Sequence, residues 1–228
     1  VFVPGIGVKL NGAHRWLGMS GVPIGQPSEA AKILIPAAFI LWVQNQKQQI
    51  QFKSFAMQLI GLAIPLSLIL IEPDNGTVFI ITISLGFLFF LSRIPMFFWF
   101  FPFCVLILCG SLVASQMPHV KNRLDVYLHP ELDLKGKGHQ PHQAKIAAGS
   151  GQLFGRGIGE SLQKLNYLPE ARSDYIAAIY AEETGFVGIV GLIVLYVAIT
   201  SAGFVIALQT KRNEAFLFAA VLSFLIAF

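Results

Sequence analysis

Residues Gly185 to Leu208 read GFVGIVGLIVLYVAITSAGFVIAL, a run without a charged side chain. About 20 apolar residues in a helix cross the hydrocarbon core of a bilayer, so this run predicts a transmembrane helix. The whole chain of 228 residues has the same character: 55% are hydrophobic, 12% are charged, and the mean hydropathy is +0.67. Soluble domains carry about 25% charged residues. The composition therefore indicates an integral membrane protein.

Similar apolar runs precede and follow this one. We expect four earlier spans and a shortened sixth, at residues 26–43, 54–71, 77–92, 96–116 and 215–228. The predicted fold is all-α: a polytopic transmembrane helix bundle with five full spans and a partial sixth. Residues 1–27, rich in Gly and Pro, are interpreted as the tail of a span followed by a loop at the membrane interface. The abrupt apolar ends indicate a fragment with spans missing at both ends.

Charge divides the connections between spans into two groups. The short connections on one face are almost purely basic and carry Lys47, Lys53, Arg93, Lys211 and Arg212. The long connection on the other face, residues 117–184, is also basic, so a raw count of cations leaves the orientation ambiguous. The positive-inside rule is strongest for short loops, which places these in the cytoplasm and residues 117–184 outside the membrane. The net charge of +4 is too small and dispersed to indicate a nucleic-acid partner.

The segment from His129 to Glu183 is the one long polar stretch, and it interleaves carboxylates, cations and glycines. Asp133 lies in a Gly- and Lys-rich part of it. It is interpreted either as a solvated turn residue or as a general base, with Lys135 and Lys137 nearby to bind an anionic substrate. Spacing alone favours the turn residue.

Two further features of this segment allow a plain and a functional interpretation. The run from Gly155 to Gly159 lacks the pattern of a nucleotide-binding loop. A tight turn is the better interpretation, although free backbone N–H groups there would suit a phosphate near Arg156. Three histidines are interpreted as surface residues rather than metal ligands, since no third ligand at a fixed spacing supports a site: His129, His139 and His142.

Glu29 and Lys32 lie at the start of the first predicted span. Residues three apart on a helix share a face, so the two are expected to form an ion pair. Charges within a membrane are costly and are often functional. A structural pair at a helix end and a pair that shapes a binding site remain equally open, and loss of Glu29 is expected to harm folding or activity.

Several motifs occur in an order that resembles the SEDS family (shape, elongation, division and sporulation proteins). They are Asn11-Gly12-Ala13-x-Arg15-Trp16, Gln26-Pro27-Ser28-Glu29-x-x-Lys32, Pro73-Asp74-x-Gly76-Thr77, Pro130-x-x-Asp133-x-x-Gly136-x-Gly138-x-Gln140 and Leu168-Pro169-Glu170-x-x-x-Asp174. The run from Gln163 to Ala171 is most similar to the division members of the family. Three positions depart from the family pattern: Glu72 replaces Gln, His139 an aromatic residue and Thr184 a Leu.

The resemblance implies that residues 1–228 are part of one ten-span enzyme of the bacterial inner membrane at the division septum. Such an enzyme polymerises lipid II into glycan strands, with Asp133 as the catalytic carboxylate facing the periplasm. It implies a class B penicillin-binding protein, other division proteins and membrane lipids as partners. Cations or a divalent metal, Mg or Mn, would stabilise the pyrophosphate leaving group. The expected substrate-binding residues are Glu29, Lys32, Lys135, Lys137, Arg156 and Asp174.

Two rival functions stay open. The first is transport, in which a lipid II flippase uses the same charges to line a path across the membrane. The second is a non-catalytic scaffold that recruits the transpeptidase. The predicted spans carry almost no charge apart from Glu29 and Lys32, which favours the polymerase over the flippase.

Overall fold

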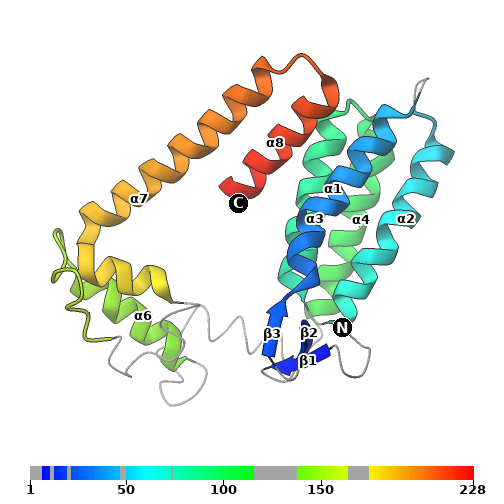
Figure 1. Ribbon diagram of the computed structural model, residues 1–228. Coiled ribbons are helices and arrows are strands. Elements are labelled where there is room, and N and C mark those ends of the chain that lie inside the picture. Colours follow the sequence, from blue (N-terminus) through cyan, green and yellow to red (C-terminus); the bar gives the residue numbers. More distant parts are fainter. Residues whose placement is uncertain are drawn as a thin grey trace. The chain divides into compact units, whose positions relative to one another are not determined.

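The computed structural model describes seven stretches of the chain, and helices dominate them (Figure 1). These stretches are residues 7–10, 13–19, 22–46, 50–72, 74–115, 138–163 and 175–228. They divide into two compact units, which are described separately. Unit 1 comprises residues 1–104 and 199–228, and unit 2 comprises residues 105–198.

Unit 1 begins with a small antiparallel sheet, which corrects the prediction of an all-α fold. Strands β1 (Gly7–Leu10), β2 (Ala13–Met19) and β3 (Val22–Gly25) form a meander in the order β1-β2-β3. This sheet lies where the sequence was interpreted as the tail of a span and an interfacial loop. The missed signal is the pair of dipeptides between the strands, Asn11-Gly12 and Ser20-Gly21. Such dipeptides are typical of tight hairpin turns.

The helices of unit 1 follow the predicted spans closely. The unit contains α1 (Pro27–Gln44), α2 (Phe52–Ile71), α3 (Asn75–Leu91), the first half of α4 (Met96–Ser115), and α8 (Asn213–Ala227). Pro27 occupies the first turn of α1, where its missing N–H leaves no helical hydrogen bond unmade. The four predicted spans between residues 26 and 116 each lie within two residues of the corresponding helix ends.

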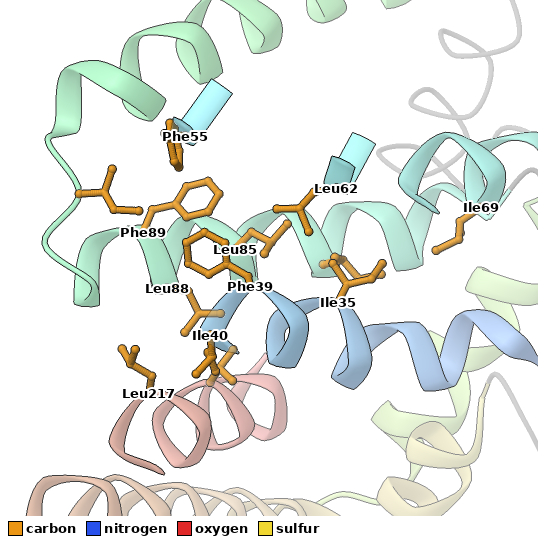
Figure 2. Packing of buried hydrophobic residues seen from close by; sticks show 13 residues of the cluster. Ile35, Phe39, Ile40, Phe55, Leu62, Ile69, Leu85, Leu88, Phe89 and Leu217 are labelled. Atoms are coloured by element: carbon orange, nitrogen blue, oxygen red, sulfur yellow. The ribbon is translucent and has the colours of Figure 1, made fainter. Parts of the chain in front are cut away.

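Aromatic rings from several helices build the core of unit 1 (Figure 2). The ring of Phe89 contacts Phe39 edge-on at a centroid distance of 4.9 Å and Phe55 at 5.2 Å. Leu88 and Leu217 are also buried in this cluster. Edge-to-face pairs contribute about 0.5–1.5 kcal/mol beyond the area that they bury. The core therefore fixes α1, α2 and α3 against one another, with α8 beside them.

The outer surface of these helices is apolar, as expected for lipid contact. Among the described residues, α2 and α7 (Ile176–Gln209) are long and apolar enough to cross a membrane, with mean hydropathies of 2.1 and 2.5. The apolar window of α7 has no buried residue, unlike the core helix of a soluble protein. The shorter helices α3 and α8 are apolar too. The number of spans, predicted as five and a partial sixth, stays a prediction.

Unit 2 contains two helical segments within what was predicted to be a loop. Helix α6 (His139–Ser150) was not predicted, because its sequence lacks an apolar stripe. Helix α7 begins at Ile176, before the predicted fifth span at Gly185. The backbone of α7 breaks at Gly185, with φ 68° and ψ −165°. The prediction that residues 1–228 form one membrane domain is not tested by this division into units.

Candidate functional site

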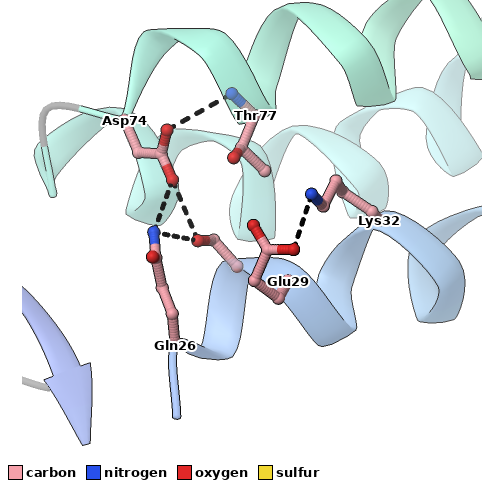
Figure 3. Close-up of polar contacts among 6 residues, drawn as sticks. Gln26, Glu29, Lys32, Asp74 and Thr77 are labelled. Carbon is pink, nitrogen blue, oxygen red and sulfur yellow. Dashed lines mark hydrogen bonds and ion pairs between the residues drawn. The ribbon is translucent and has the colours of Figure 1, made fainter. Parts of the chain in front are cut away.

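The first polar site joins the start of α1 to the start of α3 (Figure 3). Asp74 caps α3 by accepting a hydrogen bond from the Thr77 N–H at 3.3 Å. Its other carboxylate oxygen accepts hydrogen bonds from Gln26 Nε2 and from Ser28 Oγ, both at 2.9 Å. Ser28 is 1% exposed, so its hydroxyl has a partner where water has little access. Two motifs that lie about 46 residues apart in sequence are thereby joined through one carboxylate.

The predicted ion pair lies beside this network. Lys32 Nζ and Glu29 Oε2 are 2.7 Å apart, which confirms the pairing inferred from their spacing (Figure 3). The Glu29 side chain is 59% exposed and that of Lys32 is 24% exposed. An ion pair this open contributes about 0–1 kcal/mol to folding. The pair therefore adds little to the stability of α1.

The pair lies at the rim of an apolar cavity of about 350 Å³ in unit 1. Residues from α1, α3 and α8 line this cavity: Glu29, Lys32, Ile33, Ile80, Leu222, Leu225, Ile226 and Phe228. A cation and an anion at the mouth of an apolar cavity suit an amphiphilic ligand. The charged part of such a ligand would meet Lys32, and its hydrocarbon would contact the isoleucine and leucine side chains.

The second site, in unit 2, is built around the break in α7. In an unbroken helix, Phe186 N–H would donate to the carbonyl of Glu182 and Val187 N–H to that of Glu183. Instead, Phe186 donates to Gln152 O at 2.9 Å and Val187 to Leu153 O at 3.1 Å.

The carbonyls released by this break bind the same loop. Glu182 O accepts from Arg156 N at 3.0 Å, and Glu183 O accepts from Gly157 N at 3.1 Å. Four loop-to-helix hydrogen bonds therefore replace two helical ones, and the loop of residues 151–163 is fastened to the break. The break leaves none of these four backbone groups unsatisfied.

Glycine is required where the loop and the helix meet. The φ of Gly185 is +68°, and a Cβ there would lie 2.3 Å from Gly155 N. The φ of Gly155 is +77°, and a Cβ there would lie 2.1 Å from Glu183 O. Both positions thus combine a backbone conformation that side chains disfavour with an approach too close for any side chain. The glycine run serves to pack the loop against α7.

Glu182 is the buried centre of this second site. Its side chain is 1% exposed. The carboxylate accepts hydrogen bonds from Ser161 Oγ at 2.6 Å, Leu162 N at 3.2 Å and Gln163 N at 3.3 Å. Arg156 Nε lies 3.7 Å from the same carboxylate. A buried carboxylate is tolerated when hydrogen bonds and a cation compensate for lost water. Glu182 therefore locks the end of the loop to α7.

The structure answers part of the sequence-based prediction of site residues. The predicted base Asp133 and three predicted binding residues, Lys135, Lys137 and Asp174, lie outside the described residues. Arg156 is described, and its side chain is oriented by Glu182 while remaining 39% exposed.

The idea that free backbone N–H groups near Arg156 hold a phosphate is wrong for three of them. Gly155, Arg156 and Gly157 each donate to a backbone carbonyl within unit 2. The guanidinium of Arg156 is exposed in part and can still meet an anion. His139 and His142 lie in α6, and the described residues contain no group of three metal-ligating side chains.

Sequence interpretation missed the roles of Asp74 and Glu182. Asp74 had a readable signal, because an Asp followed by a Thr three residues later at a helix start is typical of an N-cap. Glu182 had none, since its partners come from residues about 20 positions earlier in the chain.

Helices with an apolar, exposed surface, two of them long and apolar enough to cross a membrane, are typical of a helical membrane protein. The chain belongs to the FtsW, RodA and SpoVE family, because the family model described as "Cell cycle protein" matches residues 1–228. This confirms the resemblance to SEDS proteins that the motifs indicated.

Curated relatives match along most of this chain. A protein of Alcanivorax borkumensis named "Probable peptidoglycan glycosyltransferase FtsW" is 37% identical over 195 residues, which cover 85% of this chain and 50% of the relative. Proteins of the same name are 36% identical in Coxiella burnetii and 35% in Legionella pneumophila. These two matches cover 100% and 94% of this chain, and 61% and 55% of the relatives. The chain thus spans between 50% and 61% of the length of these relatives.

Proposed function

We propose that the protein containing this chain is a peptidoglycan glycosyltransferase that polymerises lipid II into glycan strands during cell division. The observation that carries the proposal is the family match over residues 1–228, together with relatives of that name at 32–37% identity. The sparsely charged spans favour polymerisation over transport. Among the described spanning helices, charge is confined largely to their ends.

The reaction needs a base outside the membrane, and we assign that role to Asp133. Its carboxylate takes the proton from the acceptor sugar's hydroxyl as that oxygen attacks the anomeric carbon of the donor. The bond between that carbon and the pyrophosphate oxygen breaks, and the lipid pyrophosphate leaves with the electron pair. The proton stays on the carboxyl group until it passes to solvent.

The remaining predicted residues bind the substrate's anionic part. In the proposal, Lys135, Lys137 and Arg156 contact the pyrophosphate, and the orientation of Arg156 by Glu182 supports its part in this. Glu29 and Lys32, at the rim of the apolar cavity, contact the substrate where its head group joins its lipid chain. The cavity beside them binds the first part of that lipid chain.

A divalent cation, Mg or Mn, would add Lewis-acid stabilisation of the leaving pyrophosphate. The described residues contain no group of three His, Cys, Asp or Glu side chains that could hold it, but a Mg²⁺ bound to substrate phosphates needs only one or two protein carboxylates. No step of the reaction is assigned to a metal. The dependence of polymerisation on added metal after treatment with a chelator measures the requirement directly.

Asp174 is a second predicted site carboxylate of the loop, and its role also needs a test. It directly precedes Tyr175, whose carbonyl accepts the first hydrogen bonds of α7 from Ala178 and Ile179. A glycan polymerisation assay on Asp174→Asn distinguishes the predicted binding role of Asp174 from a role as the base.

The test is glycan polymerisation by the full-length protein with its penicillin-binding partner and purified lipid II. Asp133→Asn keeps the shape of the side chain but cannot accept the proton, so the rate should fall by about 10²–10⁴-fold. Glu131→Gln, in the same loop, is the matched control and should retain most activity. A near-normal rate for Asp133→Asn with a lost rate for Asp174→Asn would transfer the base to Asp174. Normal rates for both would refute the assignment of the base to either residue, whereas no polymerisation by the wild-type protein would favour a flippase or scaffold.

Location and orientation are part of the proposal: the bacterial inner membrane at the septum, with residues 117–184 in the periplasm. A cysteine introduced as Lys135→Cys should react with a membrane-impermeant reagent in intact spheroplasts. Reaction only after the membrane is breached would refute this orientation. Co-purification with a class B penicillin-binding protein tests the proposed partner.

A further inference from the structure

The turn between α3 and α4 carries an arginine where helices usually place glycine. Arg93 has a φ of +53°. Its N–H donates to Phe90 O at 3.1 Å, and the N–H of Ile94 donates to Phe89 O at 3.1 Å. This is the hydrogen-bond pattern of a Schellman cap, whose left-handed position favours glycine. Any residue with a Cβ is less stable in that conformation than glycine.

The cap itself does not need the Arg93 side chain. Ile94, the next residue, is buried with Phe89 in the core, and Trp99 Nε1 donates to Ile94 O at 3.3 Å. These contacts would hold the turn equally well with glycine at position 93. The Arg93 side chain is exposed, and no described residue forms a hydrogen bond or ion pair with its guanidinium. A strained residue with a side chain that the fold does not use indicates a function for that side chain.

A cavity next to Arg93 supplies the place for a ligand. It measures about 420 Å³ and lies entirely within unit 1. Its lining comes from the α1–α2 connection and the α3–α4 turn: Val43, Gln46, Ile50, Ser92, Arg93, Ile94 and Pro95. The buried Ser92 Oγ has no hydrogen-bond partner. Ser92 and Arg93 both line this cavity. The free guanidinium donates hydrogen bonds to an anion, and the Ser92 hydroxyl is a buried donor beside it.

The surroundings of the cavity match the edge of a membrane. Val43, Ile50 and Ile94 supply an apolar wall beside the polar groups. This wall lies at the ends of helices whose outer faces are apolar. In a bilayer, the cavity would therefore lie where a lipid head group meets its acyl chains. The short connections at this end are basic in sequence, and Arg212 is already paired with Glu214. Arg93 is thus a cation at the cavity without a carboxylate among its described neighbours.

We propose that this cavity binds the phosphate of an anionic phospholipid, with Arg93 as the cationic contact and Ser92 as a hydrogen-bond donor. The apolar wall contacts the glycerol and upper acyl region of the same lipid. This site is separate from the glycosyl-transfer proposal, and neither depends on the other.

The test uses the purified full-length protein in a neutral detergent, with thermal unfolding followed as phosphatidylglycerol or phosphatidylcholine is added. The wild-type Tm should rise by roughly 5 °C with phosphatidylglycerol, because a ligand that binds only the folded state stabilises it. Phosphatidylcholine should give little change. Arg93→Gly should unfold at the wild-type temperature or higher without lipid, because glycine suits the left-handed turn. It should nevertheless bind phosphatidylglycerol about fivefold more weakly, because one contact between a cation and a head group is lost.

Two further variants and one further ligand complete the test. Arg93→Asn also suits the left-handed conformation and should behave like Arg93→Gly. Lys211→Gln removes an exposed cation that does not line the cavity and should keep the full lipid response. An unchanged lipid response in Arg93→Gly would overturn the proposal. Equal losses in Lys211→Gln would also overturn it, since they would indicate diffuse charge rather than a site. Equal stabilisation by millimolar inorganic phosphate would overturn the assignment to a lipid, and failure of both Arg93 variants to fold would refute the premise about the turn.

Discussion

Replacing Glu182 with glutamine tests the lock between the 151–163 loop and α7. The two carboxylate oxygens divide their partners: Oε2 accepts from Ser161 and Gln163, and Oε1 accepts from Leu162 and faces Arg156. Glutamine has a single acceptor oxygen. Whichever way its amide turns, one backbone N–H of Leu162 or Gln163 faces an NH₂ group.

The size of the effect follows from these contacts. A buried N–H without an acceptor costs about 1–3 kcal/mol, and the surviving hydrogen bonds lose the strength that the charge gave them. Together these give about 3 kcal/mol against the locked state. The opening of the loop should then become roughly 100-fold more frequent, at 1.4 kcal/mol for each factor of ten.

Hydrogen exchange of the full-length protein in detergent measures this opening directly. The informative amides are those that donate the hydrogen bonds between loop and helix, namely the N–H groups of Arg156, Gly157, Phe186 and Val187. They should exchange about 100-fold faster in Glu182→Gln, while amides in the core of unit 1 keep their rates. Glu160→Gln changes an exposed carboxylate in the same loop and serves as the control. Exchange within threefold of wild type in Glu182→Gln would refute the lock.

Three further substitutions probe the two sites by thermal unfolding. Gly185→Ala should lower the free energy of unfolding by at least about 2–4 kcal/mol, since the backbone conformation is nearly restricted to glycine and a Cβ would lie 2.3 Å from Gly155 N. Gly191→Ala is the control, because open space surrounds its Cβ, and it should leave the stability unchanged. Equal losses in the two variants would contradict the packing argument. Asp74→Ala should cost about 3 kcal/mol from the lost cap and the buried donors left without a partner, and a loss below 1 kcal/mol would show that the network is dispensable. Glu29→Ala should cost less than about 1 kcal/mol because the pair is open to solvent; a larger loss would contradict that exposure.

The spans were predictable because membrane helices have one dominant physical requirement, an uninterrupted apolar length. The ends of α1 to α4 follow directly from where charged, proline and turn residues interrupt that length. The ion pair of Glu29 and Lys32 was predictable for a similar reason, since both partners lie on one helix at a fixed spacing.

The parts that could not be predicted depend on partners far away in sequence. The break at Gly185 looks unfavourable within α7 alone, and only the 151–163 loop compensates for it. Helix α6 has no apolar stripe to mark it, and its one buried residue is Ala147. The role of Glu182 likewise appears only once Ser161 and Leu162 are beside it.

The acidic residues of this chain differ in whether their carboxylates have structural partners. Of the twelve, seven are described, and most of these have structural partners: Glu29 pairs with Lys32, Asp74 caps α3, Glu182 fastens the loop and Glu214 binds Arg212. Glu72 is buried, Glu183 is partnered and Glu160 is exposed. A carboxylate that already accepts structural hydrogen bonds cannot take a proton without releasing them, so its loss would impair folding and catalysis together.

The candidates for the base are therefore the exposed Glu160 and the five acids outside the described residues, namely Asp125, Glu131, Asp133, Glu170 and Asp174. Each can be replaced by its amide and assayed for lipid II polymerisation and for Tm. The base should be the one whose amide lowers the rate by about 10²–10⁴-fold while leaving the Tm unchanged. Parallel losses of rate and Tm would indicate another structural carboxylate. If all six amide variants polymerise normally, a carboxylate base is excluded from residues 116–137, from residues 164–174 and from position 160.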